Sequence, residues 1–356
     1  MHVVISGYYG FGNVGDEAVL AATLGALRAR VPSARFTVLS ANPRETERSH
    51  TVNSVSRAGI GAVRAIAGAD LFLSGGGSLI QDVTSARSAL YYLGLLGLAT
   101  MLSRRTMVFA QGIGPLRRRW VRALARGILN RVHLVTVRDE DSQRLLQEFG
   151  IRQTAHVVAD PVFALVPAPR QRGEDILGDA ARPRIGLALR SWGNDGFLLP
   201  LIEAITSIRG RIGGTAVVLA FHPERDLPIC RTASVSLGGR LVGDLSPEDT
   251  MAVVGCLDVL VGVRLHALMC AVAMGVVPVG ISYDPKVDGL FRRIGIGHLL
   301  PLQHLQPGPL KQAVMSAWGS REDLRPQLLR AAALLREDAL RAVDLAAALL
   351  TSATPA

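Results

Sequence analysis

Short apolar runs alternate with amphipathic stretches along most of the chain, a pattern typical of α/β proteins. In the first half, the apolar runs predict strands at Val3–Ser6, Phe36–Ser40, Leu71–Ser74, Thr106–Ala110, Leu134–Val137 and His156–Val158. Helical periodicity between them predicts helices at Asp16–Arg30, Ala86–Leu102, Arg119–Asn130 and Glu140–Phe149. Strands that are apolar on both faces, with helices between them, indicate a parallel sheet covered on both sides.

A segment rich in proline, glycine and charge, residues 166–184, interrupts this pattern and is predicted to be a linker. The alternation then resumes, with strands predicted at Ile185–Leu189, Ala216–Ala220, Val259–Val261 and Val276–Ile281. We therefore predict an α/β fold of two Rossmann-like, doubly wound domains, residues 1–168 and 169–308, which face each other across a cleft. The Ala-, Leu- and Arg-rich residues 309–356 are predicted to form a helical tail.

The charge of the chain points to an anionic partner. Its 39 basic and 29 acidic residues give a net charge of +10, and Lys286 and Lys311 are its only lysines. A preference for arginine codons explains the scarcity of lysine better than a functional cause does. A basic protein still attracts anions, such as a phosphorylated substrate or an anionic membrane. Clusters of aromatic and basic residues typical of nucleic-acid-binding platforms are absent, so we expect no nucleic-acid partner.

The sequence predicts a cytoplasmic protein. Three scattered cysteines, Cys230, Cys256 and Cys270, fit neither a disulfide framework nor a zinc site, and Met1 leads directly into a strand without a signal peptide. The strongly apolar, uncharged run Ser88–Ser103 is shorter than the roughly 20 residues that span a bilayer, and we expect a buried helix there. Arginines flank this run, which leaves peripheral contact with the inner membrane leaflet open.

The loop after the first strand carries the first candidate chemistry. Gly10, Gly12, Asn13 and Gly15 lie between this strand and a helix, where glycines permit close approach of a ligand to the backbone. The spacing differs from the dinucleotide motif GxGxxG. Asp16, which follows, is a candidate to orient or deprotonate a sugar hydroxyl, or alternatively caps the helix.

Two further glycine-rich loops follow strands of the same predicted sheet. Gly75, Gly76, Gly77 and Ser78 come after one strand, and Gly112 comes after the next. Carboxyl ends of parallel strands share one sheet edge, where ligands of doubly wound sheets bind. The three loops together therefore predict ligand-approach loops at this edge, although each alone is explained by a tight turn.

Cationic side chains follow strands in both predicted domains. Arg138 lies where a strand passes into a helix and suits a carboxylate or phosphate, although an ion pair with Asp139 or Asp141 explains it equally well. In the second half, Arg264 and His266 follow one strand and Lys286 follows the next. A histidine at that place suits proton transfer, although it could also be a packed or capping residue.

Asp160 and His222 also follow strands. We favour a capping or orienting role for Asp160, and we give His222 less weight than the other basic residues at its edge. No motif with metal-ligand spacing, no Walker loop and no GxSxG occurs in the sequence, so metal-dependent and P-loop chemistry are disfavoured and no metal ligand is predicted.

Several segments occur in an order that resembles a known family. They are GYYGFGNVGDEA, LFLSGGGSLIQD, AQGIGP, VTVRDEDS, ADPVF and GVRLHALMCAVAMGVVPVGISYDPKVDGL, over roughly residues 1–300. Together they resemble the polysaccharide pyruvyltransferases, most closely the bacterial ketal-pyruvyltransferases of CsaB type in secondary cell-wall polymer synthesis. The resemblance implies a fold similar to GT-B glycosyltransferases, phosphoenolpyruvate as the donor substrate, and no cofactor.

The resemblance also implies roles for single residues. Arg138, His266 and Lys286 match positions that hold phosphoenolpyruvate, and we add Arg264 because it is close in sequence. His266 then serves as the general acid, and Asp16 is the candidate base or acceptor anchor. The implied acceptor is a lipid-linked glycan whose N-acetylmannosamine receives a pyruvate ketal, the group that S-layer homology domains bind. The first domain is then the acceptor side and the second the donor side, and the oligomeric state stays open.

Two other functions compete with this interpretation. A nucleotide-sugar glycosyltransferase of GT-B fold in cell-envelope polysaccharide synthesis has the same domain plan. Such an enzyme should carry an acidic residue in the second domain that binds the ribose of the donor nucleotide, and the sequence beside Arg264 and His266 contains no clear candidate. A non-catalytic protein of exopolysaccharide export has the same fold without the chemistry.

Overall fold

The computed structural model describes residues 1–83 and 86–352, and its contacts divide the chain into two compact units. Unit 1 contains Met1–Phe11, Asp16–Leu165 and Leu335–Ala356, and unit 2 contains Gly12–Gly15 and Val166–Leu334. The chain passes from unit 1 to unit 2 after Leu165, near the predicted end of the first domain at residue 168. The predicted tail does not form a unit of its own, because the division assigns part of it to each unit.

Unit 1 contains a seven-stranded sheet with the order β3-β2-β1-β4-β5-β6-β7, in which all neighbours are parallel. Its strands are β1 (His2–Ser6), β2 (Arg35–Ser40), β3 (Asn53–Ser56), β4 (Leu71–Ser74), β5 (Thr106–Gln111), β6 (Leu134–Val137) and β7 (Ala155–Val157). The strand order reverses between β1 and β4, and in doubly wound sheets the carboxyl edge at such a point is where ligands bind.

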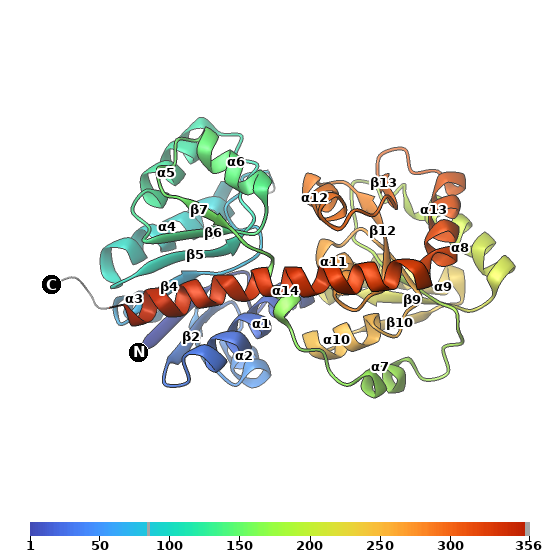
Figure 1. Cartoon of the computed structure of the whole chain (residues 1–356), viewed down its shortest axis with the longest axis horizontal. Helices are drawn as coiled ribbons and strands as arrows, with labels where there is room; N and C mark the ends of the chain where they lie inside the picture. Colours follow the sequence, from blue (N-terminus) through green and yellow to red (C-terminus); the bar gives the residue numbers. More distant parts are fainter. Residues whose placement is uncertain (84–85, 353–356) are drawn as a thin grey trace. The chain divides into compact units, whose positions relative to one another are not determined.

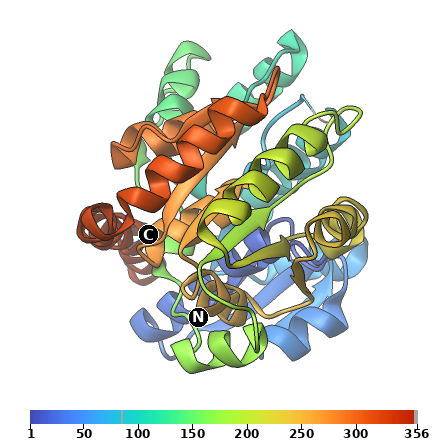
Figure 2. The ribbon, with the colours of Figure 1, turned by 90° about the vertical axis from the view of Figure 1, so that its right-hand side faces the viewer.

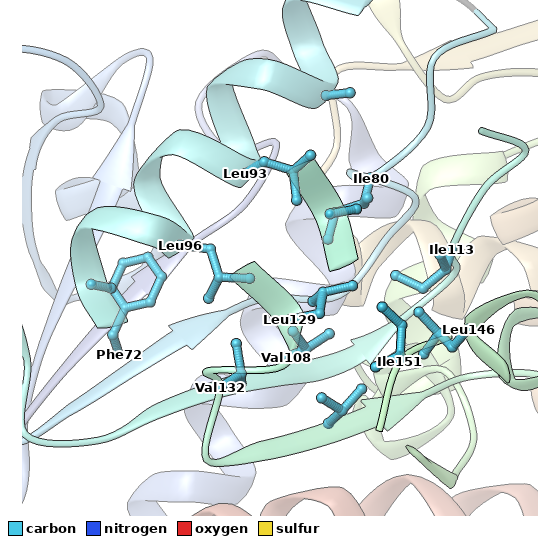
Figure 3. Close-up of a cluster of buried hydrophobic side chains, with 14 of the residues drawn as sticks. Phe72, Ile80, Leu93, Leu96, Val108, Ile113, Leu129, Val132, Leu146 and Ile151 are labelled. Atoms are coloured by element: carbon cyan, nitrogen blue, oxygen red, sulfur yellow. The ribbon is translucent and has the colours of Figure 1, made fainter. Parts of the chain in front are cut away.

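Helices cover both faces of this sheet (Figure 1). They are α1 (Val14–Arg30), α2 (Pro43–His50), α3 (Ile60–Ala67), α4 (Ala86–Leu102), α5 (Arg119–Leu129) and α6 (Glu140–Glu148), with a 3-10 turn, η1 (Pro161–Ala164). On one face, Leu93 and Leu96 of α4 and Leu129 of α5 pack with Phe72 and Val108 of the strands (Figure 3). Burial of this apolar surface is the main force that holds helices and sheet together.

The other face of the sheet is covered by α1 and by the end of α14 (Arg321–Thr351), the long red helix in Figure 1. Ala342, Ala346 and Leu350 of α14 are buried in the core of unit 1. The small alanine side chains allow the helix to lie close to its neighbours. The end of α14 is therefore part of the unit 1 core.

Unit 2 contains a six-stranded parallel sheet with the order β10-β9-β8-β11-β12-β13. Its strands are β8 (Arg184–Ala188), β9 (Thr215–Ala220), β10 (Arg240–Gly243), β11 (Val259–Gly262), β12 (Val277–Ser282) and β13 (Leu299–Pro301). Here the order reverses between β8 and β11. The carboxyl edge of the unit 2 sheet, like that of the unit 1 sheet, is therefore a place where ligands of doubly wound sheets bind.

The helices of unit 2 lie between these strands in sequence. They are α7 (Arg170–Leu177), α8 (Leu198–Ile212), α9 (Pro223–Leu237), α10 (Pro247–Val254), α11 (Leu265–Ala273), α12 (Pro285–Ile294) and α13 (Pro307–Gly319). Figure 2 shows α8 and α13 packed side by side. The predicted linker is wrong in part, because residues 170–177 form α7, which packs on α10. The helix buries Leu177 despite its polar composition.

Candidate functional site

The first predicted loop lies at the carboxyl end of β1, beside the point where the strand order of unit 1 reverses. Gly10 and Gly12 adopt positive φ angles of 75° and 67°, which explains the need for glycine. Glu17 fixes the loop: its Oε1 accepts a hydrogen bond from the Gly10 amide at 2.8 Å, and its Oε2 pairs with His50 Nε2 at 2.9 Å. Sequence reasoning did not assign Glu17 a role, although it directly follows Asp16.

The side chain of Tyr9 explains why two of the positions near the first loop are glycine. Its ring is fully buried, and a Cβ at Gly7 or Gly75 would lie within 2.5 Å of its ring or hydroxyl. A Cβ at Gly76 would meet Val19 at 2.7 Å. Gly75 and Gly76, predicted as ligand-approach positions, thus face side chains of the protein itself. Burial raises the pKa of Tyr9 well above its usual value, and the nearby Asp16 carboxylate raises it further.

Asp16 lies inside α1 and is not its cap, because the helix begins at Val14. Its side chain is buried and points to the triple-glycine loop, where a Cβ at Gly77 would lie 3.0 Å from Asp16 Oδ1. Gly77 has a φ of 90°, and its carbonyl accepts a hydrogen bond from the Gly112 amide at 2.9 Å. The structure therefore brings Asp16 together with two of the predicted loops.

Arg138 is buried in unit 1, where polar side chains surround its guanidinium. Its Nη1 donates to Asp160 Oδ2 at 2.8 Å and its Nη2 donates to Ser78 Oγ at 2.9 Å, while Asp139 lies 3.6 Å from Nε. Gly112 leaves room for this guanidinium, since a Cβ there would lie 2.8 Å from Arg138 Nε. Two of the predicted loops thus hold Arg138 in a fixed orientation, and Asp160 both orients it and caps η1 through the amide of Val162.

An aromatic cluster, which the sequence analysis did not identify, lies beside the first loop. The rings of Tyr8 and Phe11 stack at 4.1 Å, and the guanidinium of Arg57 lies 5.0 Å from the Phe11 ring and 4.0 Å from the Tyr91 ring. Tyr91 Oη donates to the Arg57 carbonyl at 2.5 Å, and Tyr92 lies edge-on to Tyr91 at 5.0 Å. These side chains are half-buried except for Tyr92, so part of each ring or cation is accessible.

In unit 2, His266 lies in the first turn of α11, directly after β11. The segment Gly12–Gly15 belongs to this unit, and the Val14 amide donates to the Phe221 carbonyl at 2.8 Å. A Cβ at Gly15 would lie 2.3 Å from His266 Nδ1, so the absence of a side chain at Gly15 makes room for the imidazole. Within unit 2, the structure therefore joins Gly12–Gly15 to the RLH segment, which lies far away in the sequence.

Arg264 precedes His266 and forms an ion pair with Asp226, which is completely buried. Asp226 Oδ2 also accepts a hydrogen bond from the His222 amide at 2.9 Å, and this carboxylate thereby orients Arg264. Both His222 ring nitrogens are buried without a hydrogen-bond partner among the described residues. Burial and the nearby Arg264 lower the pKa of His222 to about 4, so its imidazole is neutral at pH 7.

Lys286 lies in the first turn of α12, directly after β12, and is half-buried. Asp284 caps this helix and accepts a hydrogen bond from the Lys286 amide at 3.1 Å. Because β11 and β12 are adjacent and in register, with Gly262 opposite Gly280, Lys286 and His266 follow neighbouring strands at one edge. That their side chains hold one anion, and that Arg138 joins them, stay predictions.

Sequence reasoning missed a third cationic side chain at the same edge, beside Arg264 and Lys286. Arg190 follows β8, and its Nη1 donates to Tyr283 Oη at 2.7 Å. Its guanidinium also lies 5.7 Å from the ring of Trp192, which packs 4.5 Å from the Tyr283 ring. The signal was present in the sequence, because Arg190 follows a strand just as Arg138 does.

A cavity of about 240 Å³ lies at the opposite end of the unit 2 sheet. Arg182 and Asp258, which precede β8 and β11, are among its lining residues and form an ion pair at 2.9 Å. The cavity contains none of the predicted site residues, and we assign it no role in the reaction.

Comparison with solved structures defines the class of fold. A glycosyltransferase from Rickettsia africae superimposes with a TM-score of 0.64 at 12% identity over 99% of each chain. A UDP-GlcNAc 2-epimerase from Neisseria meningitidis matches with a TM-score of 0.62 at 10% identity, over 97% of this chain and 99% of that one. Anabaena HepE, in complex with UDP and glucose, matches with a TM-score of 0.62 at 13% identity over 97% of both. The chain thus has a GT-B-like fold of two Rossmann-like domains.

The family is defined by sequence. A model of the polysaccharide pyruvyl transferase family matches residues 13–285, which include most of the predicted site residues. The chain therefore belongs to the polysaccharide pyruvyl transferase family, as its motifs predicted, and is a transferase of polysaccharide synthesis. A comparison with curated proteins found no match. No helix among the described residues is long and apolar enough to cross a membrane.

Proposed function

We propose that this protein transfers the pyruvyl group of phosphoenolpyruvate to a cell-envelope glycan and forms a pyruvate ketal. The observation that carries this proposal is the set of groups at the carboxyl edge of unit 2. Arg264, His266 and Lys286 follow the adjacent strands β11 and β12, beside the point where the strand order reverses. Two cations and an imidazole at one sheet edge suit a small substrate with two anionic groups.

Phosphoenolpyruvate presents such a pair of groups, a carboxylate and a phosphate. Arg264, held by the buried Asp226, supplies a guanidinium of fixed orientation for one of them. Lys286, on a flexible stem, supplies a point charge for the other. Cations that already face the departing phosphate stabilise the charge that develops on it without reorganisation, which is the largest source of rate enhancement in many enzymes.

His266 is the proposed general acid. It donates a proton to the methylene carbon of phosphoenolpyruvate, which leaves a positively charged centre at the carbon bearing the carboxylate. One sugar hydroxyl adds to that carbon and a second displaces phosphate, so two C–O bonds form and the C–O bond to phosphate breaks. Of the two hydroxyl protons, one replaces the proton that His266 donated and the other leaves with phosphate. A neighbouring anion favours the protonated imidazole that this step requires.

The acceptor side of the proposal rests on unit 1. Tyr8 and Phe11 offer a stacked, half-exposed aromatic surface, and Arg57 and Tyr91 border it. The apolar face of a pyranose ring stacks on such surfaces while its hydroxyls bond to polar neighbours. Asp16 is the proposed base or anchor for a sugar hydroxyl. We propose a lipid-linked precursor with N-acetylmannosamine as the acceptor and a role in S-layer anchoring.

A nucleotide-sugar glycosyltransferase is the second candidate, because the structural relatives include a glycosyltransferase and a HepE structure with UDP and glucose. Thermal unfolding in the presence of phosphoenolpyruvate or of UDP-sugars separates the two functions. We expect phosphoenolpyruvate to raise the unfolding temperature and UDP-sugars to leave it unchanged. Stabilisation by a UDP-sugar alone would favour the second candidate.

The assignment of His266 is tested by His266→Ala in a transfer assay with phosphoenolpyruvate and glycan. We expect transfer to be abolished while binding of phosphoenolpyruvate survives in part, because the cations remain. His156→Ala, which removes an exposed histidine of β7, is the control and should keep normal turnover. Normal turnover of His266→Ala would remove this residue from the acid role.

A further inference from the structure

The positive charge of the chain is concentrated in one stretch of unit 1. Residues 83–138 contain ten arginines and no lysine, aspartate or glutamate, so this stretch carries +10. The whole chain has 39 basic and 29 acidic residues, which leaves 29 of each for all other residues. The net charge of the protein therefore comes from this one stretch, which includes α4, β5, α5 and β6.

Most of these arginines are on the surface of two neighbouring helices or next to them. Helix α4 packs on α5, and both cover the same face of the sheet. Most of the arginine side chains are exposed, among them Arg87, Arg117, Arg119 and Arg126. Arg104 pairs with Asp70, and the buried Asp82 carboxylate accepts hydrogen bonds from the Arg117 and Arg118 amides. Among the described residues, no ion pair involves the side chain of Arg117, Arg119 or Arg126. The outer surface of α4 and α5 is thus a cationic patch.

Large apolar side chains are exposed in the same patch. On α5, Trp120 is 49% and Leu124 is 37% exposed, and they lie one turn apart, on a different side of the helix from the buried Val121 and Ala125. On α4, Leu90 is 39% and Met101 is 70% exposed. These apolar groups lie between arginines in the sequence, so the patch can contact an apolar layer and an anionic layer at the same time.

We infer that the outer surface of α4 and α5 binds the surface of an anionic phospholipid membrane. Tryptophan and leucine on one side of a helix, with arginines around them, is the pattern of helices that lie in a membrane interface. Arginines attract the anionic headgroups, and exposed apolar side chains enter the boundary of the acyl layer. This placement is peripheral, since α4 buries Tyr92, Leu93 and Leu96 in the core of unit 1.

Other partners fit the patch less well. Nucleic acid would be attracted by the charge but offers no apolar layer for Leu124 or Met101, which do not stack on bases as aromatic rings do. A second copy of the chain would bring ten further positive charges to the same surface, which opposes association. The combination of charge and aliphatic exposure therefore favours a lipid surface. This inference does not depend on the proposed reaction.

The test is co-sedimentation of the full chain with vesicles. We compare vesicles of equal parts phosphatidylglycerol and phosphatidylcholine with vesicles of phosphatidylcholine alone. We expect binding to the anionic vesicles, little to the neutral ones, and a steep loss in high salt. Arg117→Gln with Arg119→Gln should weaken binding by about 30-fold, at roughly fivefold per arginine near a charged surface.

A second variant separates membrane binding from simple charge attraction. Trp120→Gln with Leu124→Gln leaves the charge unchanged and should weaken vesicle binding by about tenfold or more. The matched controls are in unit 2, where Arg211 and Arg231 are exposed, and Leu199 and Val235 are 73% and 82% exposed. The same substitutions to Gln there should leave vesicle binding unchanged, and thermal unfolding shows that every variant is folded.

Three results would overturn the inference. The first is equal binding of the wild-type chain to neutral and anionic vesicles, or no binding to either. The second is loss of binding in the control variants to the same extent as in the α5 variants. The third is loss of vesicle binding in the arginine variant alone, together with tight binding of a DNA duplex that Trp120→Gln with Leu124→Gln does not change, which would indicate a nucleic-acid surface.

Discussion

The contact between Gly15 and His266 makes a strong prediction about the proposed site. Gly15→Ala would add a Cβ 2.3 Å from Nδ1, 2.6 Å from Cγ and 2.8 Å from Cβ of the histidine. Ordinary contacts of a Cβ begin near 3.4 Å, so the imidazole has to move by about 1 Å. A misplacement of that size can reduce a catalytic rate by about 100-fold. We expect a loss of this order in kcat for pyruvyl transfer.

The same substitution should not unfold the protein. Gly15 lies inside α1 and does not have a positive φ, so alanine fits its backbone and favours the helix by about 0.5–1 kcal/mol. The control is Gly25→Ala in the same helix, where a Cβ would meet nothing within 4 Å. Steady-state transfer kinetics and thermal unfolding of both variants form the assay. Normal kcat in a folded Gly15→Ala protein would refute the role of His266.

Three further predictions concern other basic side chains, Lys286, Arg138 and His222. Lys286→Ala should weaken phosphoenolpyruvate binding, measured by calorimetry, and unchanged affinity would refute its assignment. Arg138→Met should lower the free energy of unfolding in urea by about 3–5 kcal/mol because it leaves the Asp160 carboxylate buried without its cation. Arg138→Met with Asp160→Asn should recover much of that loss, and additive losses would contradict the pairing. Because the pKa of His222 is about 4 in the folded chain, below its usual 6.5, the unfolded chain binds its proton first as pH falls. The wild-type protein should therefore lose about 2 kcal/mol of stability between pH 6.5 and pH 4 through this residue, and His222→Asn, compared in urea at both pH values, should lose less.

Much of the fold could be predicted because buried parallel strands produce apolar runs that are easily recognised. The predicted bounds of β4, β6 and α4 match those in the structure. The missed strands β3, β10 and β13 have only three or four residues each and lie at sheet edges, so none of them produces a long apolar run in the sequence. The helix α2 (PRETERSH) was missed because it is almost entirely polar and buries only Thr46 and His50.

The candidate site could be predicted only where a residue directly follows a strand. This rule found His266 and Lys286, which follow β11 and β12, and these two strands are parallel neighbours in the sheet. It could not find Asp226 or Arg57, because each acts through a partner distant in sequence, Arg264 and the aromatic rings respectively. The rule also assigned too many glycines to ligand binding. The sequence cannot distinguish a glycine that makes room for a ligand from one, such as Gly75, that makes room for the ring of Tyr9.

The most direct test of the central claim is to incubate the protein with phosphoenolpyruvate and lipid-linked glycans that contain N-acetylmannosamine, and to weigh the product. The account predicts that each modified glycan gains the mass of pyruvic acid less one water and that one phosphate is released per glycan. Sugar transfer from a UDP-sugar with release of UDP, and no pyruvylated product under any of these conditions, would contradict it.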